Sequence, residues 1–278
     1  MADLYRGMDR ETLDLAYNNS RAVPQVETLI ASMLSRSEHA YANFTHERDL
    51  AYGDGARQRY DWFPGVTPDA PVLVFIHGGY WQSRCKEDFA FVVEGPLAAG
   101  FQVVLAEYTL APEASMTRIV AEIGALLDQL ARDGDGLGIG EAPLVLSGHS
   151  AGGHLAAVHR SHPRVTHALP ISGLMDLEPI RLGTLNDPLD LSAGEVEHFS
   201  PQRRIGPGVP MVVAVGGAEL AELVRHSHDY ALACQAAGEA AEYLAVPGRN
   251  HFDVLDELAA PDGALVAAAR RLLAGAAR

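Results

Sequence analysis

The stretch APLVLSGHSAGGHLAAV, residues 142–158, joins two different sequence patterns through a serine that lies between glycines. Residues 142–147 form a short apolar run without polar alternation, which is typical of a strand buried on both faces of a sheet. Residues 150–161 follow at once and favour a helix. An ordinary turn from strand to helix does not require so many small residues, so the stretch points to a special role for Ser150.

The same succession of strand and helix continues in both directions from this stretch. Short apolar runs without alternation occupy 71–77, 101–108, 142–147, 167–172, 210–215 and 241–246. Helical patterns lie between or after them, at 86–99, 114–133, 150–161, 219–237 and 261–275. This order predicts an α/β protein whose mostly parallel central sheet has about eight strands, with helices on both faces.

Three segments lie outside this alternation. Residues 1–40 carry apolar residues at helical spacing and predict a helical N-terminal appendage. Two short runs around Gly53-Asp54-Gly55 predict a hairpin. Residues 174–208 are rich in Pro, Gly and Asp and predict a cap-like excursion with short helices, too short for a domain of its own. We therefore expect one domain over residues 1–278.

The composition narrows the classes of partner. The chain has 21 Lys and Arg against 36 Asp and Glu, a net charge of -15, which opposes binding to nucleic acid or to anionic membranes. The N-terminus lacks the apolar core of a signal peptide, and no apolar run reaches the roughly 18 residues of a membrane span. Two distant cysteines, Cys85 and Cys234, are expected to be reduced thiols of a cytoplasmic protein. The oligomeric state stays open, and a homodimer is one of the alternatives.

The residues around Ser150 match the pattern G-x-S-x-G between a strand and a helix. A nucleophile at the tip of such a tight turn adopts strained backbone angles, and Gly148 and Gly152 would relieve the crowding around it. The helix dipole and the N–H group of Ala151 could then face a developing oxyanion. The pattern predicts a nucleophilic Ser150; the alternative is a serine that only caps the helix.

A second motif, His77-Gly78-Gly79-Tyr80-Trp81, ends an earlier predicted strand. Its glycines would let backbone N–H groups approach a substrate oxygen, as the second arm of an oxyanion hole requires. We expect Gly78, Gly79 and Tyr80 to form this arm and the rings of Tyr80 and Trp81 to contact substrate. The alternative is a glycine turn followed by two core aromatics.

The predicted base is His251, in a loop after the last strand, where an imidazole keeps the reach that proton transfer needs. The acid should follow the strand at 210–215. Glu219 is the first candidate in reach of that strand end, and we favour it. Glu222, nearly one turn further on, and Asp176, after the preceding strand, are the alternatives.

The chain has 12 histidines, and a group of them lies near the serine helix, at His149, His154, His159 and His162. Their spacing does not match H-E-x-x-H or another ligand pattern, so we expect no metal site. The last two are expected to be solvated or locally bonded. His149, which precedes Ser150, is expected to contact substrate.

With these residues placed, the chain resembles the α/β-hydrolase superfamily over nearly its whole length. Within it, HGGYW (77–81) together with GHSAGGHL (148–155) resembles the kynurenine formamidase (arylformamidase) branch, which is related to the HGG-type esterases and lipases. The stretches ELAELVRHS and GRNHF, near the C-terminus, are also similar to that branch. So are residues 17–21, in the leading segment that borders the active site in the branch.

One position departs from the branch. Its members often have Asp where Glu219 stands here, followed by Ser-Pro-Glu-Phe, whereas this chain continues with LAEL. Glu is chemically adequate, because the acid only has to fix the imidazole tautomer and balance its charge. The departure leaves the group Ser150, Glu219 and His251 intact and leaves the substrate open.

The resemblance implies a serine hydrolase that cleaves a formyl or small acyl group from an aryl amide and needs neither a metal nor an organic cofactor. N-formyl-L-kynurenine would give L-kynurenine and formate. The alternatives are a carboxylesterase for short-chain or aryl esters and a hydrolase fold kept as an inactive binding protein. Each of these has a small molecule as its expected partner.

Overall fold

The computed structural model describes residues 4–67, 69–132, 134–139 and 142–275. Within them an eight-stranded sheet runs in the order β1-β2-β4-β3-β5-β6-β7-β8. Its strands are β1 (Glu47–Ala51), β2 (Arg59–Phe63), β3 (Val72–Ile76), β4 (Gln102–Ala106), β5 (Leu144–His149), β6 (His167–Ile171), β7 (Met211–Gly216) and β8 (Ala241–Val246). The strands from β3 to β8 pair in parallel, and the hairpin β1–β2 joins β4 antiparallel. The predicted α/β fold class is confirmed.

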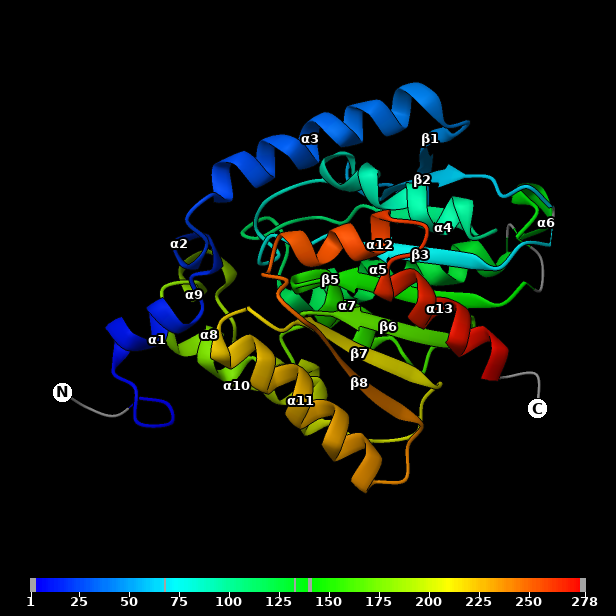
Figure 1. The fold of residues 1–278 in the computed structure, drawn as a ribbon. Helices are drawn as coiled ribbons and strands as arrows, with labels where there is room; N and C mark the ends of the chain where they lie inside the picture. The colour runs from blue at the N-terminus through cyan, green and yellow to red at the C-terminus, as the bar shows by residue number, and fades with distance from the viewer. Residues whose placement is uncertain (1–3, 68, 133, 140–141, 276–278) are drawn as a thin grey trace.

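The helices follow the predicted alternation (Figure 1). They are α1 (Arg10–Ala16), α2 (Asn19–Ala22), α3 (Val26–Asn43), η1 (Lys86–Val93), α4 (Glu94–Ala98), α5 (Met116–Arg132), α6 (Gly134–Leu137), α7 (Ala151–Val158), α8 (Glu178–Leu182), α9 (Asn186–Leu189), α10 (Ala193–Phe199), η2 (Pro201–Arg203), α11 (Ala221–Ala236), η3 (Asp253–Leu255), α12 (Asp256–Ala259) and α13 (Ala264–Gly275), where η marks a 3₁₀ helix. The helix predicted over 86–99 is instead a 3₁₀ segment followed by a short α-helix. Pro96 lacks the N–H that a continuous α-helix would need there, and it is tolerated in the first turn of α4.

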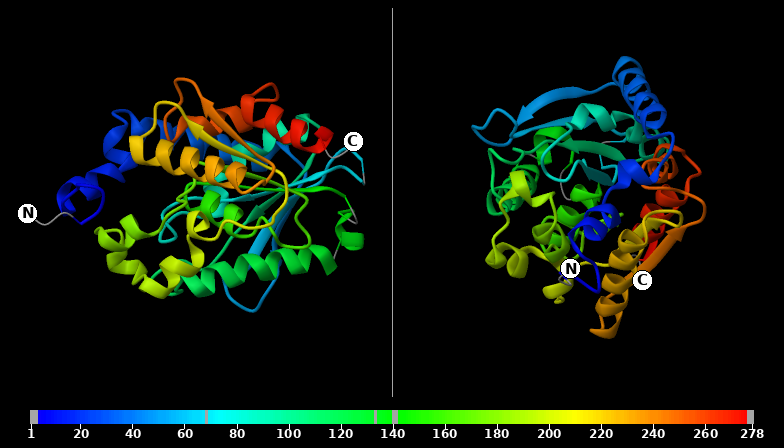
Figure 2. Two further views of the ribbon diagram at one scale, coloured as in Figure 1. Left: turned by 90° about the horizontal axis from the view of Figure 1, so that it is seen from below. Right: turned by 90° about the vertical axis from the view of Figure 1, so that its left-hand side faces the viewer.

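Alternate residues of β3 pack on opposite faces of the sheet. Val72, Val74 and Ile76 join the core formed with α5 and α7. Leu73 and Phe75 join the core formed with η1, α12 and α13. Figure 2 shows α5 and α13 on opposite sides of the sheet. Because both faces are covered, the strand sequence is apolar throughout, as the unalternated pattern predicted.

The N-terminal helices lie along one side of this layered core. In Figure 1, α3 crosses above η1, and α1 and α2 lie on the left, beside the short helices α8 and α9. A buried carboxylate, Asp61, helps to fix α3, because it accepts a hydrogen bond from Tyr41 at 2.6 Å and pairs with Lys86 at 3.2 Å. The segment 174–208 carries α8, α9, α10 and η2, which agrees with the short helices predicted there. In the described residues, no helix has both the length and the apolar character to cross a membrane.

Candidate active site

Ser150 occupies a strained turn between β5 and α7. Its backbone has φ 56° and ψ -116°, a conformation that costs on the order of 1–3 kcal/mol in a non-glycine residue. Its N–H donates to the carbonyl of Ile171 in the neighbouring strand at 2.9 Å. A Cβ on Gly152 would lie 1.9 Å from the carbonyl oxygen of Ile76, and one on Gly148 would lie 2.4 Å from the oxygen of Gly152. The two glycines therefore allow the close approach of backbones that this turn requires.

Glu219 and His251 meet in the loops that follow β7 and β8. The Nδ1 atom of His251 lies 2.6 Å from Oε2 of Glu219, and the two side chains are 7% and 0% exposed. The other carboxylate oxygen, Oε1, accepts the N–H of Gly216 at 2.7 Å and the hydroxyl of Ser172 at 2.5 Å. Glu219 is thus held by three donors, and it presents one oxygen to the imidazole. Sequence reasoning did not identify Ser172, although it stands at a strand end before a glycine.

The two alternative acids lie elsewhere. Glu222 accepts the hydroxyl of Tyr17 at 3.1 Å and pairs with Arg225 at 2.6 Å. Burial alone would raise the pKa of Glu222, but Arg225 and the hydrogen bond from Tyr17 hold it below its usual value. Asp176 accepts the hydroxyl of Tyr5 at 3.1 Å. Both carboxylates therefore anchor the N-terminal segment, and Glu219 is the candidate acid that contacts His251.

Ser150 and His251 line the same cavity, together with His149. The rings of His149 and His251 lie 4.5 Å apart between centroids. Burial, together with the nearby His251, holds the pKa of His149 well below its usual value, so its ring is neutral. Among the described residues, the structure gives no hydrogen bond between the Ser150 hydroxyl and His251. Such bonds between a nucleophile and its base are often long without substrate and tighten in the complex.

The loop after β3 lies opposite the serine turn. Gly79, Tyr80 and Trp81 all have positive φ, at 111°, 50° and 59°. A Cβ on Gly78 would lie 3.0 Å from the carbonyl of His149, so this glycine keeps the loop against the serine turn. Within the described residues, no acceptor takes the N–H of Gly79, of Tyr80 or of Ala151 in the facing turn. These three groups are the donors expected for an oxyanion.

Charged residues behind the loop fix it in place. The ring of His77 bridges the carbonyl of Gly78, at 2.7 Å, and the carboxylate of Glu107, at 3.0 Å. Burial alone would raise the pKa of Glu107, but His77 and Arg57 hold it below its usual value. Glu107 also accepts the N–H of Lys86. The glycine loop is therefore attached to a buried charged residue and is positioned before substrate arrives.

Tyr80 and Trp81 have different surroundings. Tyr80 lines the cavity, and its hydroxyl donates to the carbonyl of Tyr17 at 2.6 Å. Trp81 is 0% exposed and packs edge-on against His154, with the ring centroids 5.0 Å apart. Trp81 is absent from the described residues that line the cavity. The expectation that Trp81 contacts substrate is wrong, because the left-handed backbone at Tyr80 and Trp81 turns the indole into the core.

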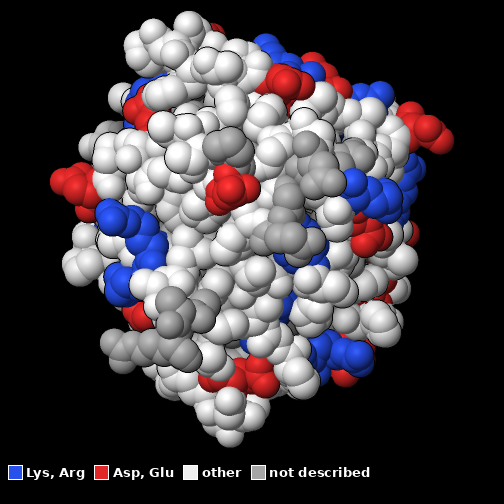
Figure 3. All heavy atoms as spheres, turned by 90° about the vertical axis from the view of Figure 1, so that its right-hand side faces the viewer, with Lys and Arg blue, Asp and Glu red and all other residues white. Residues whose placement is uncertain are grey.

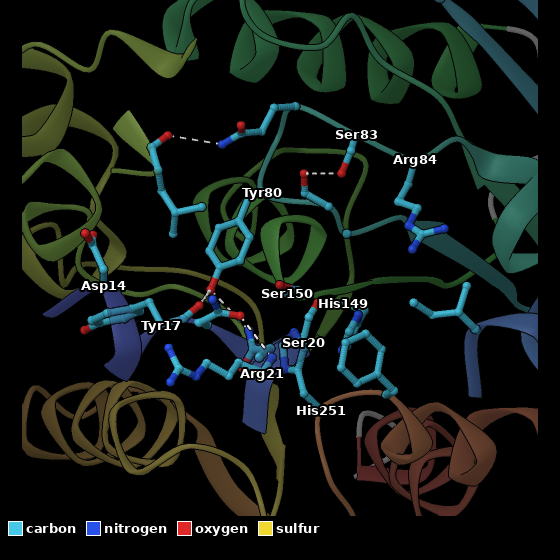
Figure 4. Close-up of a pocket in the computed structure, with 18 of the residues that line it drawn as sticks. Asp14, Tyr17, Ser20, Arg21, Tyr80, Ser83, Arg84, His149, Ser150 and His251 are labelled. Atoms are coloured by element: carbon cyan, nitrogen blue, oxygen red, sulfur yellow. Dashed lines mark hydrogen bonds between the residues drawn. The ribbon is translucent and has the colours of Figure 1, made fainter. Parts of the chain in front are cut away.

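The cavity has a volume of about 810 Å³ and is bounded by segments that are far apart in the sequence. This volume falls within the range of about 300–1,000 Å³ that is typical of small-molecule sites. Figure 4 shows Tyr17, Ser20 and Arg21 below Tyr80, near His149, Ser150 and His251. The described residues that line it come from α1, α2, α3, the loop after β3, η1, the serine turn, the α8–α9 connection and the loop after β8. The N-terminal helices thus form one wall of the site.

One group of side chains outside this cavity has the composition of a metal site. Ligand atoms of Cys85, Glu87 and Glu107 lie within 4.8 Å of one another. The carboxylates already have cationic partners, because Glu87 pairs with Lys86 and Glu107 pairs with Arg57 at 2.7 Å. The cluster is therefore satisfied as a set of ion pairs. His154 is also engaged, since its Nε2 lies 2.7 Å from the carbonyl of Phe199.

Proteins of known family, sequence or structure are similar to this chain. The BD-FAE family matches residues 64–167. A kynurenine formamidase of Danio rerio is 26% identical over 276 residues, which cover 91% of this chain and 93% of that protein. A Silicibacter protein assigned as a thioesterase has a TM-score of 0.84 at 28% identity, covering 92% of this chain and 98% of the other. An esterase of Pyrobaculum calidifontis has a TM-score of 0.74 at 20% identity, covering 98% and 95%, and shows likeness of fold.

Proposed function

The chain is an HGG-type α/β-hydrolase, and from that premise we propose that it is a serine hydrolase that removes a formyl or small acyl group from an aryl amide. The observation that carries the proposal is the 2.6 Å hydrogen bond between Glu219 and His251 beside a cavity that Ser150 also lines. A carboxylate on Nδ1 selects the tautomer whose Nε2 is free to accept a proton. The position of the three groups is typical of nucleophilic acyl transfer.

In the first half-reaction, His251 accepts the proton of the Ser150 hydroxyl while the oxygen attacks the carbonyl carbon. The carbonyl π bond breaks, and its electron pair moves to the oxygen of a tetrahedral intermediate. The N–H groups of Gly79, Tyr80 and Ala151 donate to that oxygen. Each such donor contributes about 3 kcal/mol to stabilising the transition state.

The intermediate then collapses. His251 donates its proton to the leaving nitrogen, the carbon–nitrogen bond breaks, and the aniline departs while the formyl group stays on Ser150 as an ester. In the second half-reaction, His251 accepts a proton from water, and the hydroxide oxygen attacks the ester carbonyl. Cleavage of the ester bond releases formic acid, which ionises to formate in solvent, and the proton on His251 returns to the oxygen of Ser150. The carboxylate of Glu219 stabilises the imidazolium that forms twice in the cycle.

The proposed substrate is N-formyl-L-kynurenine, which would give L-kynurenine and formate. Similarity to proteins named kynurenine formamidase over most of the chain supports this choice. A small formyl group needs little space beside Ser150. The ring of Tyr80, which lines the cavity, offers an aromatic surface to the aryl group.

The second candidate is a carboxylesterase for short-chain or aryl esters. The specific observation in its favour is the size of the cavity, about 810 Å³, which accommodates acyl groups larger than formyl. The same three residues and the same oxyanion donors would serve this reaction. The leaving group would then be an alcohol or a phenol.

The test is a substrate panel with active-site labelling. We expect kcat/KM for formanilide and N-formyl-L-kynurenine to exceed that for p-nitrophenyl acetate and butyrate, and a fluorophosphonate to label Ser150 stoichiometrically. Efficient ester hydrolysis with negligible formamide turnover would replace the formamidase proposal by the esterase. Lack of both labelling and turnover would indicate the inactive binding protein. Ser150→Ala is the control for labelling at that position.

A further inference from the structure

We propose that Arg21 binds a carboxylate group of the substrate, so that the enzyme selects aryl formamides or esters that carry a negative charge remote from the scissile bond. This inference rests on the proposed hydrolase function and adds the substrate class. It starts from the N-terminal wall of the cavity, to which α2 contributes Arg21. The proposed reaction does not use an arginine, so the catalytic steps do not explain why a guanidinium lies in this wall.

The backbone around Arg21 is attached to the oxyanion loop. The side chain of Asn18 caps α2 by accepting the N–H of Arg21 at 3.0 Å. Asn19 donates to the Tyr80 hydroxyl at 3.1 Å, and that hydroxyl donates to the carbonyl of Tyr17 at 2.6 Å. Tyr80 therefore links α2 to the loop that faces Ser150. The position of Arg21 relative to the scissile bond is set by this connection.

The charges of the cavity wall single out Arg21. Three arginines line the cavity. Arg10 lies 3.8 Å from a carboxylate oxygen of Asp187, and Arg84 lies 3.7 Å from one of Asp88. For Arg21, the described part of the chain provides no carboxylate partner within salt-bridge distance. The guanidinium is exposed at the cavity and is available to a ligand.

A general excess of basic residues does not explain why Arg21 lies at the cavity. The chain has a net charge of -15. On the face drawn in Figure 3, acidic and basic side chains are interspersed, so that face does not present a basic field. Within the cavity, Asp14 is engaged, because it accepts the N–H of Thr184 at 2.7 Å. The carboxylate of Glu11, on α1, also lines the cavity, so the wall is not positive as a whole; Arg21 is the arginine of this wall that has no carboxylate partner among the described residues.

The chemistry of a guanidinium indicates the kind of group it would bind. Its planar N–H donors match the two oxygens of a carboxylate, and one unpaired cation balances one negative charge. A substrate held in this way would place its carboxylate at α2 and its carbonyl carbon at Ser150. The aryl group would lie between them, beside Tyr80. The structure thus assigns the two ends of the substrate to two segments that are distant in the sequence.

The test compares substrates that differ only in charge. N-formyl-L-kynurenine is paired with its carboxamide, and the ester 3-(4-acetoxyphenyl)propanoate, whose carboxylate lies beyond the aryl ring of the leaving group, is paired with its carboxamide. We expect wild-type protein to prefer the carboxylate member by about tenfold in kcat/KM, the effect of one water-exposed, charge-assisted hydrogen bond. In Arg21→Gln this preference should fall to near unity through a higher KM for the anion. Arg21→Lys should retain part of it.

The matched control is Arg10→Gln, which removes the same charge from the same cavity at an arginine that already has a partner. The preference should survive in this variant. If both variants lose the preference for the carboxylate substrate equally, the effect is one of long-range charge. If the preference persists in Arg21→Gln, other groups bind the carboxylate. Either result overturns the inference. If neither formamide is hydrolysed, the formamidase proposal fails and the ester pair still tests Arg21. If no substrate turns over, titration calorimetry of L-kynurenine and its carboxamide provides the same comparison.

Discussion

Glu219 and His251 are joined by a 2.6 Å hydrogen bond between Oε2 and Nδ1, although they stand 32 residues apart in different loops. The bond is buried, and the second carboxylate oxygen is held by Gly216 and Ser172. Buried, charge-assisted hydrogen bonds of this kind orient both partners strongly. The proton-accepting side of the imidazole is therefore directed before substrate binds.

Replacing Glu219 by Gln should lower kcat by about three to four orders of magnitude with little loss of folded protein, because an amide cannot stabilise the imidazolium or select the same tautomer. The measurement is kcat on formanilide, with circular dichroism to verify folding. Glu222→Gln is the matched control, since Glu222 contacts Tyr17 rather than His251. The assignment is wrong if the Glu222 variant loses as much activity as the Glu219 variant.

Ser172 is expected to position Glu219 rather than to contact substrate. Its φ of 52° is left-handed, and its hydroxyl donates to Glu219. Ser172→Ala and Ser172→Gly both remove this hydrogen bond, but only glycine adopts the positive φ without strain. We expect both variants to lose about tenfold in kcat at unchanged KM, the effect of one hydrogen bond to a charged group.

The comparison of the two Ser172 variants separates the hydroxyl from the backbone. A glycine variant with wild-type kcat would show that strain, and not the hydrogen bond, explains the alanine result. The pH dependence of kcat/KM provides a second readout, because a displaced Glu219 should shift the acidic limb, whereas simple loss of stability should not. An unchanged profile together with unchanged kcat would remove Ser172 from the positioning role.

Gly152→Ala should destabilise the fold by about 3 kcal/mol or more, because the added Cβ would lie 1.9 Å from the carbonyl oxygen of Ile76 in β3. Urea unfolding followed by circular dichroism measures the change. Gly124→Ala, in α5, is the control. There the nearest atom is His159 Cε1 at 3.4 Å, and alanine favours the helix, so stability should stay equal or rise by up to about 1 kcal/mol.

Acid should destabilise the protein in part through its buried histidines. Burial lowers the pKa of His154 to about 4, and burial with the nearby Arg225 lowers that of His226 to about 4. In the unfolded chain both would titrate near 6.5, so between about pH 6.5 and 4 the unfolded chain binds protons that the folded protein does not. The free energy of unfolding therefore falls as the pH falls through this window, by about 1.4 kcal/mol per pH unit for each such histidine.

Urea unfolding of wild-type protein and His226→Gln between pH 7 and 4.5 checks this dependence. We expect the variant to be less stable at pH 7, since His226 accepts the N–H of Met175 and lies 3.0 Å from the Tyr17 hydroxyl oxygen. The unfolded variant should bind about one proton fewer than the unfolded wild-type chain at low pH, so the stability of the variant should depend less steeply on pH. His39→Gln, at an exposed position of α3, is the comparison. An equal change of slope in both variants would contradict the role of burial.

The sequence by itself determined the parts of this protein that depend on local patterns. Unalternated apolar runs predicted strands covered on both faces, because β3 has to contribute side chains to two cores at once. The glycines beside Ser150 predicted a crowded turn, and the close contacts at Gly148 and Gly152 supply the reason. Such features can be read from neighbouring residues because their physical causes act over a few positions of the chain.

Only the tertiary structure decided which distant groups meet. The helix α11 begins at Ala221, so Glu219 lies in the loop before it and Glu222 lies in its first turn. Trp81 enters the core because the backbone before it is left-handed, which composition does not reveal. Arg21 reaches the cavity through hydrogen bonds between residues more than sixty positions apart. These outcomes depend on the packing of whole elements against each other, and that packing minimises a free energy to which the entire chain contributes.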